Sequence, residues 1–212
     1  MINSHLKGRK ARNILGSLKP LSRYLPTKTL ETIYKSFIRP HLDYCDTIYH
    51  EPSKINALGQ SLSTIMEDIE RVQYQAALVV TGAWKGTSRT KLYEELGWES
   101  LSDRRRIRRV LLLHKIVNNS TPDYLKAKLP VQRILGNEDS PSLFATPGRY
   151  NSTNRFNNSF FPDAIKNWNV FIPTFQTMPS FTVLKAHLNN LFRPKCKSIF
   201  GIHDRNGIRL IY

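Results

Sequence analysis

Five arginines stand close together near the middle of the sequence, at Arg104, Arg105, Arg106, Arg108 and Arg109. We expect them in the first turns of a helix, where the positive end of the macrodipole disfavours cations. A phosphate group would compensate this unfavourable placement. We therefore predict that four of these side chains, Arg104, Arg105, Arg108 and Arg109, bind the phosphates of nucleic acid.

Acidic residues just before the arginine block offer a different interpretation. Glu94, Glu95, Glu99 and Asp103 could neutralise most of the block through internal ion pairs. A solvated charged face is the third possibility. All three interpretations remain open from the sequence.

A second basic cluster lies near the N-terminus and consists of Lys7, Arg9, Lys10 and Arg12. We expect a basic helix over residues 3–18, on which these side chains are neighbours three or four positions apart. The cluster is a second candidate surface for phosphate contact. A charged face that is only solvated is the alternative.

Some aromatic residues are candidates for stacking on bases. Tyr24, Trp84 and Tyr150 are of this kind. Most other aromatic residues stand at helical spacing, so we expect them in the core. Trp168 is the clearest example of a predicted packing residue.

The sequence contains no pattern of a catalytic site. Several carboxylates must converge to hold two metal ions. The adjacent acids at 67–68 and 138–139 have no apolar strand pattern around them, and those at 94–95 fall on an expected helix. Neither zinc spacing nor a nucleophile elbow nor a phosphate loop is found. We expect no catalytic residue, no metal, no cofactor and no small-molecule substrate.

The stretch from Leu30 to Tyr49, LETIYKSFIRPHLDYCDTIY, has the clearest helical pattern. Its apolar and aromatic residues recur at the i, i+3, i+4, i+7 spacing of one helix face. Pro40 removes a backbone donor and disfavours helical angles at Arg39. We therefore expect two short helices, or one kinked helix, with a shared buried face.

Helical periodicity continues along the rest of the chain, and no strand alternation is found. Further helices are expected over residues 58–80, 90–96, 102–118, 124–129 and 180–192, and from Ser159 onward. We predict an all-α fold, an irregular helical bundle with a loop-rich linker and a small C-terminal helical part. The expected division is a helical domain over 1–129, a linker or sparsely pinned loop over 130–158, and a C-terminal helical segment over 159–212.

Composition indicates the class of partner. The chain has 212 residues, a formal net charge of +16 and a pI near 10.1, which favours a polyanion, nucleic acid before a membrane surface. No apolar run is long enough for a membrane span. Two distant cysteines favour a reducing compartment, so we expect an intracellular protein, nuclear or cytoplasmic.

Three blocks in this order resemble a known family. They are Leu30–Tyr49, Arg155–Phe171 (RFNNSFFPDAIKNWNVF) and Asp204–Ile211 (DRNGIRLI). The chain is similar over nearly its whole length to the C-terminal region, thumb and post-thumb, of a jockey-like non-LTR retrotransposon reverse transcriptase.

The resemblance implies a part of a mobile-element RNA-directed DNA polymerase. In that family a palm domain with a Tyr/Phe-x-Asp-Asp motif holds the metal ions, and this chain lacks the motif. The implied role is to bind the template–primer duplex, RNA–DNA or DNA, through its phosphates and without sequence preference. The chain would act with a separate palm and fingers portion, and alone it is expected not to polymerise. An independent helical interaction protein and a truncated copy without function are the alternatives.

Overall fold

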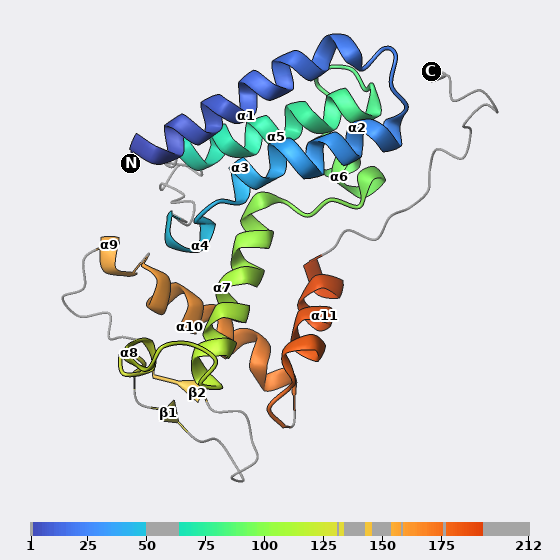
Figure 1. Cartoon of the computed structure of the whole chain (residues 1–212). Helices are drawn as coiled ribbons and strands as arrows, with labels where there is room; N and C mark the ends of the chain where they lie inside the picture. The colour runs from blue at the N-terminus through green and yellow to red at the C-terminus, as the bar shows by residue number, and fades with distance from the viewer. Residues whose placement is uncertain are drawn as a thin grey trace. The chain divides into compact units, whose positions relative to one another are not determined.

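The computed structural model describes residues 2–49, 64–130, 132–133, 143–145, 154–157, 159–175 and 177–192. Within them the fold is all-α, as predicted. The extended elements of this part of the chain are two short strands, β1 (Gln132–Arg133) and β2 (Leu143–Phe144). They pair antiparallel, with Gln132 opposite Phe144 (Figure 1).

The described residues form two compact units. The N-terminal unit contains residues 2–46 and 64–101, and the C-terminal unit contains residues 47–49 and the described part of 102–192. This division differs from the expected boundary after residue 129. The helix that follows Leu101 buries its apolar side in one core with the C-terminal helices, so the two parts expected to be separated by a linker pack together.

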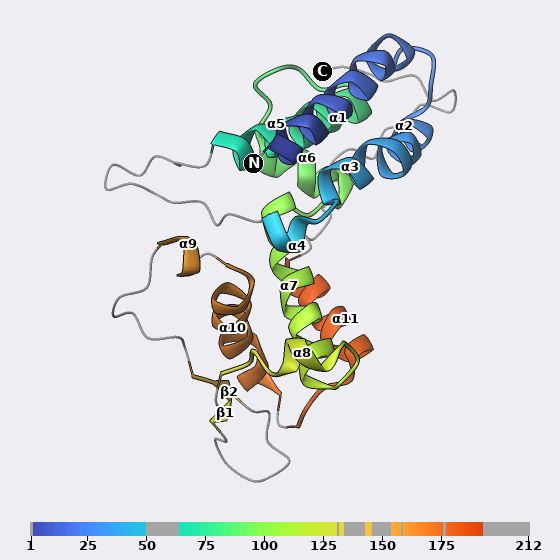
Figure 2. The same ribbon diagram turned by 60° about the vertical axis from the view of Figure 1, so that its left-hand side comes forward.

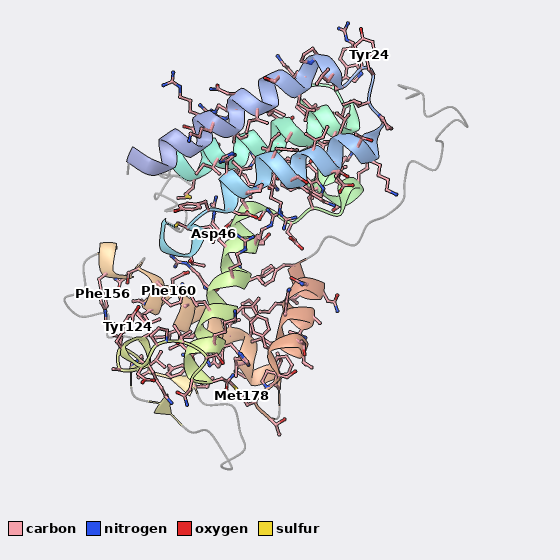
Figure 3. The ribbon with its side chains drawn as sticks, in the orientation of Figure 1. Tyr24, Asp46, Tyr124, Phe156, Phe160 and Met178 are labelled. Carbon is pink, nitrogen blue, oxygen red and sulfur yellow. The ribbon has the colours of Figure 1, made fainter. Side chains whose placement is uncertain are left out.

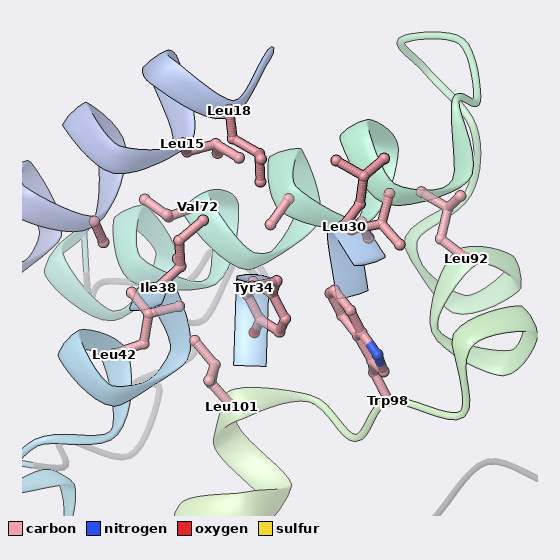
Figure 4. Packing of buried hydrophobic residues seen from close by; sticks show 14 of the residues in the cluster. Leu15, Leu18, Leu30, Tyr34, Ile38, Leu42, Val72, Leu92, Trp98 and Leu101 are labelled. Carbon is pink, nitrogen blue, oxygen red and sulfur yellow. The ribbon is translucent and has the colours of Figure 1, made fainter. Parts of the chain in front are cut away.

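The N-terminal unit is a bundle of helices. Its elements are α1 (Ile2–Leu21), α2 (Thr27–Ile33), the π-helix η1 (Tyr34–Ile38), α3 (Arg39–Asp43), α5 (Thr64–Thr81) and α6 (Arg89–Leu96), and α4 (Asp46–Tyr49) follows α3. Helices α1 and α5 lie side by side, and α2 and α3 pack along them (Figures 1 and 2). The core includes Leu15, Leu30, Tyr34 and Val72 (Figure 4).

The segment around Pro40 is helical, and the expectation for Arg39 was wrong. Arg39 has helical angles (φ −56°, ψ −40°), and its N–H donates to the carbonyl of Tyr34, five residues back. This wider π turn directly precedes Pro40, and the chain continues as a helix through the proline. The turn also changes the helical phase, so Phe37 is 62% exposed although its spacing placed it on the buried face.

Two glycines end helices of the N-terminal unit. Gly82 has a φ of +72° and follows α5 directly. Gly97 has a φ of +61° after α6, and the next N–H, that of Trp98, donates to the carbonyl of Tyr93 at 2.9 Å. Such left-handed positions favour glycine because it has no Cβ.

The C-terminal unit packs helices around an aromatic core. Its elements are α7 (Leu101–Val117), α8 (Asp123–Lys126), α9 (Asn154–Asn157), α10 (Phe160–Phe171), the 3-10 helix η2 (Ile172–Thr174) and α11 (Phe181–Phe192). Val110, Leu113, Trp168 and Leu184 are fully buried in it. The packing role predicted for Trp168 is confirmed.

One part of the expected linker is pinned to this core. Phe144 is buried among the core residues. Its N–H donates to Oδ1 of Asn169 at 3.1 Å, and its carbonyl accepts from Nδ2 of the same side chain at 2.8 Å. The side-chain amide of Asn169 thus takes the place of a second neighbouring strand for Phe144. The expected helix start at 58–63, Tyr150, the side chain of Lys7 and the block Asp204–Ile211 lie outside the described residues.

Candidate nucleic-acid interface

Helix α1 has one apolar and one basic face. Ala11, Leu15 and Leu18 are buried against α5. The rest of the helix surface is exposed and carries four cations, with Arg9, Arg12 and Lys19 along one stripe and Lys10 on the other flank. At 1.5 Å per residue, Arg9 and Lys19 are separated by about 15 Å along the axis. That length matches roughly four phosphate steps of one strand at 3.4 Å each.

This basic face has few acidic neighbours. Residues 1–30 contain no Asp or Glu. Arg12 lies 3.8 Å from Asp68 of α5, and Asp68 also pairs with Arg71 at 3.2 Å. Both are surface pairs of the kind that stabilise little and exchange readily. In the part of the chain that the structure describes, no acid lies within ion-pair distance of Arg9, Lys10 or Lys19.

Gly16 leaves part of the α1 backbone uncovered on the same face. It lies between Arg12 and Lys19, and a Cβ built on it would meet no atom within 4 Å. The backbone of α1 is therefore open to solvent at the middle of the stripe. A sugar–phosphate backbone could approach the helix closely there.

The arginine block of α7 lies in different surroundings. Arg104 and Arg105 are only 5% and 4% exposed, and Arg109 is fully buried. Nη1 of Arg109 lies 2.7 Å from Oδ2 of Asp163 in α10, and its guanidinium is 5.9 Å from the centre of the Phe160 ring.

The phosphate contact predicted for Arg109 therefore needs correction, because a fully buried guanidinium bonded to a carboxylate is closed to a phosphate. Charge compensation inside the protein explains this residue. Its carboxylate partner Asp163 is 54 residues further along the chain. Arg104 and Arg105 are likewise closed to solvent in this structure.

The remaining arginines of the block are more accessible. Arg106 is exposed, with its guanidinium 5.7 Å from the ring centre of Phe192. Arg108 is half-buried and interacts within the protein. Of the four α7 residues predicted to bind phosphate, Arg108 alone keeps substantial exposure. α1 therefore presents the more accessible basic surface among the described residues.

A polar network supports the helices beneath α1. The hydroxyl of Tyr34 donates to Oε1 of Gln73 at 2.9 Å, and Nε2 of Gln73 donates to the carbonyl of Glu99 at 2.8 Å. The Tyr34 ring stacks on Trp98, with centroids 4.1 Å apart (Figure 4). These buried bonds fix η1, α5 and the segment before α7 to one another.

Two ionisable groups next to this network have shifted pKa values. Burial alone would raise the pKa of Glu31, but hydrogen bonds from Lys35 and from Nε1 of Trp98 outweigh it, so the pKa is lowered. Burial and the neighbouring carboxylate of Glu70 raise the pKa of Tyr93, whose hydroxyl donates to that carboxylate at 3.0 Å. Glu70 also accepts the N–H of Leu101 at 3.1 Å. The hydrogen bonds of Glu31 and Tyr93 thus connect elements of the N-terminal unit.

Helix α7 starts one residue earlier than expected, and the carboxylate of Glu70 caps it. The helix begins at Leu101, so Ser102, where we expected the helix to start, lies inside the first turn. The side chain that accepts the first N–H comes from α5. A cap supplied by a distant element leaves no local sequence signal.

Among the described residues, no group of three His, Cys, Asp or Glu side chains is placed to hold a metal ion. None of the helices in this part of the chain is long and apolar enough to cross a membrane.

Comparisons with known proteins add no relative. No protein-family model, no curated protein and no solved structure matches the chain.

Sequence reasoning missed one member of the basic face. Lys19 lies on the exposed side of α1, seven residues after Arg12 and ten after Arg9. This spacing returns to the same side of a helix, so the signal was present. We had ended the helix at residue 18, but α1 continues to Leu21 and carries Pro20 in its last turn.

Proposed function

We propose that the chain binds a nucleic-acid duplex through its phosphates, without sequence preference, and that α1 carries the main contact surface. The observation that supports this is the group of exposed cations Arg9, Lys10, Arg12 and Lys19 on a segment without acids. Binding by such a group is electrostatic and releases counterions from the nucleic acid.

The resemblance described above extends this proposal. We infer that the chain is part of an RNA-directed DNA polymerase of a mobile element, from its thumb and post-thumb region. In that setting α1 would hold the template–primer duplex while a separate palm carries the chemistry. Polymerisation by this chain alone is not expected, so the proposed activity is binding.

A binding assay tests the proposal directly. Labelled DNA duplexes of two unrelated sequences and an RNA–DNA hybrid are titrated with the protein at moderate salt. The two DNA sequences should bind with the same affinity, because phosphate contacts carry no base information. A marked preference for one sequence, or no binding to any duplex, would reject the proposal.

Matched variants assign the contact to α1. The α1 variant replaces Arg9, Lys10 and Lys19 by Gln. The control variant replaces three exposed lysines of the C-terminal unit, Lys128, Lys166 and Lys185, by Gln. Both lose three charges, so a general effect of net charge would weaken both alike. We expect the α1 variant to bind much more weakly than the control.

A further inference from the structure

The loop between α5 and α6 presents an exposed tryptophan. Trp84 is 73% exposed, whereas Trp98 and Trp168 are buried. A single exposed aromatic side chain is common on protein surfaces and needs no explanation by itself. The hydrogen bonds and the charges around Trp84 set it apart.

Hydrogen bonds hold the backbone of this loop in place. The carbonyl of Trp84 accepts from Oγ1 of Thr87 at 2.8 Å and from the N–H of the same residue at 3.2 Å. The hydroxyl of Tyr74 accepts from the N–H of Gly86 at 3.3 Å and donates to the carbonyl of Thr87 at 3.0 Å. Gly86 has a φ of +98°, which favours glycine. The indole thus projects from an ordered backbone, which lowers the ordering cost of binding.

The surroundings of the indole are basic. Lys85, Arg89 and Lys91 are exposed, and no acid follows Trp84 before Glu94. Positive charge beside an exposed aromatic ring is the combination that sites for unpaired nucleic-acid strands use, because phosphates follow the charges while bases stack on the ring.

The loop is also close to the basic face of α1. Ala83 packs in the same cluster as Leu18 near the end of α1. In Figure 1 the loop from α5 to α6 lies at the end of the unit where α1 ends. A strand that follows the cations from Arg9 to Lys19 would lead toward this loop. The exposed Tyr24, on the connector after α1, lies at the same end (Figure 3).

We propose that Trp84 is a stacking site for an unpaired base, next to the phosphate-binding face of α1. The ligand is a single-stranded segment, such as the unpaired template beside a duplex. This inference rests on the proposed nucleic-acid binding and adds a contact that a fully paired duplex cannot make.

Tryptophan fluorescence gives a direct test, because Trp84 is the exposed tryptophan and stacking on a base quenches its emission. Wild-type protein is titrated with a short oligothymidylate and with a blunt-ended duplex of equal length. We expect quenching with the oligothymidylate and loss of that quenching in Trp84→Phe. In an anisotropy assay, Trp84→Ala should bind the oligothymidylate roughly 5- to 150-fold more weakly and the duplex within about twofold of wild type.

The control is Phe37→Ala, which removes another exposed aromatic ring from the same unit. It should leave both affinities unchanged. Equal weakening of both probes by Trp84→Ala, or oligothymidylate binding without quenching, would overturn the stacking site. If Trp84→Ala binds like wild type while the α1 variant binds weakly, the stacking site fails and the proposed function stands. If wild type binds neither probe, both fail.

Discussion

Helices α1 and α7 carry the two densest groups of basic residues in the described chain, and their side chains lie in different surroundings. On α1, Arg9 and Lys10 are exposed and have no acid within ion-pair distance among the described residues. On α7, Arg109 is fully buried, with Asp163 at 2.7 Å. The same residue types thus form a surface on one helix and part of the protein interior on the other.

Helical phase explains the difference. Arg9 and Arg12 are out of phase with the buried Ala11, Leu15 and Leu18. Arg105 and Arg109, by contrast, continue a row at four-residue intervals from Leu101 to Leu113, both of which are buried. A cation in an apolar row is carried into the core and requires a carboxylate there. The density of basic residues alone does not distinguish the two cases, whereas their phase relative to leucine does.

The largest effect should follow from breaking the buried pair of α7. Asp163→Asn removes the carboxylate that contacts the buried charge of Arg109, and we expect a loss of about 3–5 kcal/mol in the free energy of unfolding. Urea denaturation followed by circular dichroism measures it. Lys166→Gln, an exposed change on the same helix, should stay within about 0.5 kcal/mol. Equal stability of Asp163→Asn and wild type would mean that Arg109 does not need this partner.

A smaller effect on stability should follow from protonation of Glu31. Its partner Lys35 is half-exposed, so the exposure of this cation lies between that of the α1 cations and that of the buried Arg109. The Glu31 carboxylate lies 2.6 Å from Nζ of Lys35, and its pKa is lowered from the ordinary 4.5. Because the folded state binds the proton less readily, the stabilisation is present above pH 4.5 and is lost as the pH falls through the lowered value.

Unfolding free energies measured at successive pH values below 5 test this expectation. Wild type should lose stability more steeply than Glu31→Gln, which has no proton to bind at this position. Parallel pH profiles for the two proteins would show that the Glu31 pair contributes nothing measurable.

The smallest effect on stability should come from α1. Arg9, Lys10 and Lys19 make no ion pair in the described structure, so the α1 variant should unfold within about 0.5 kcal/mol of wild type for each substitution. Thermal unfolding measures this difference. A large loss would indicate that these side chains stabilise the bundle, and the contrast with α7 would disappear.

The sequence predicted the features that depend on local patterns. Helical periodicity identified the all-α class. It did not reveal the π turn before Pro40, in which the N–H of Arg39 donates to the carbonyl of Tyr34. Two partners far along the chain were also hidden, since Asp163 and Asn169 reach Arg109 and Phe144 only after folding. The exposed positions of Arg9, Lys10 and Arg12 follow from the helical pattern of residues 3–18, and Lys19 was missed because the expected helix ended before it.

The salt dependence of duplex binding tests the central claim that α1, and not the arginine block of α7, contacts phosphates. The α1 variant is compared with an α7 variant in which Arg106 and Arg108, the accessible members of the block, are replaced by Gln. Circular dichroism first establishes that both are folded. We predict that the slope of log K against log[salt] flattens by about 2.7 for the α1 variant, about 0.9 for each of three lost contacts, and stays near the wild-type value for the α7 variant. A flattened slope in the α7 variant together with an unchanged slope in the α1 variant would contradict the account.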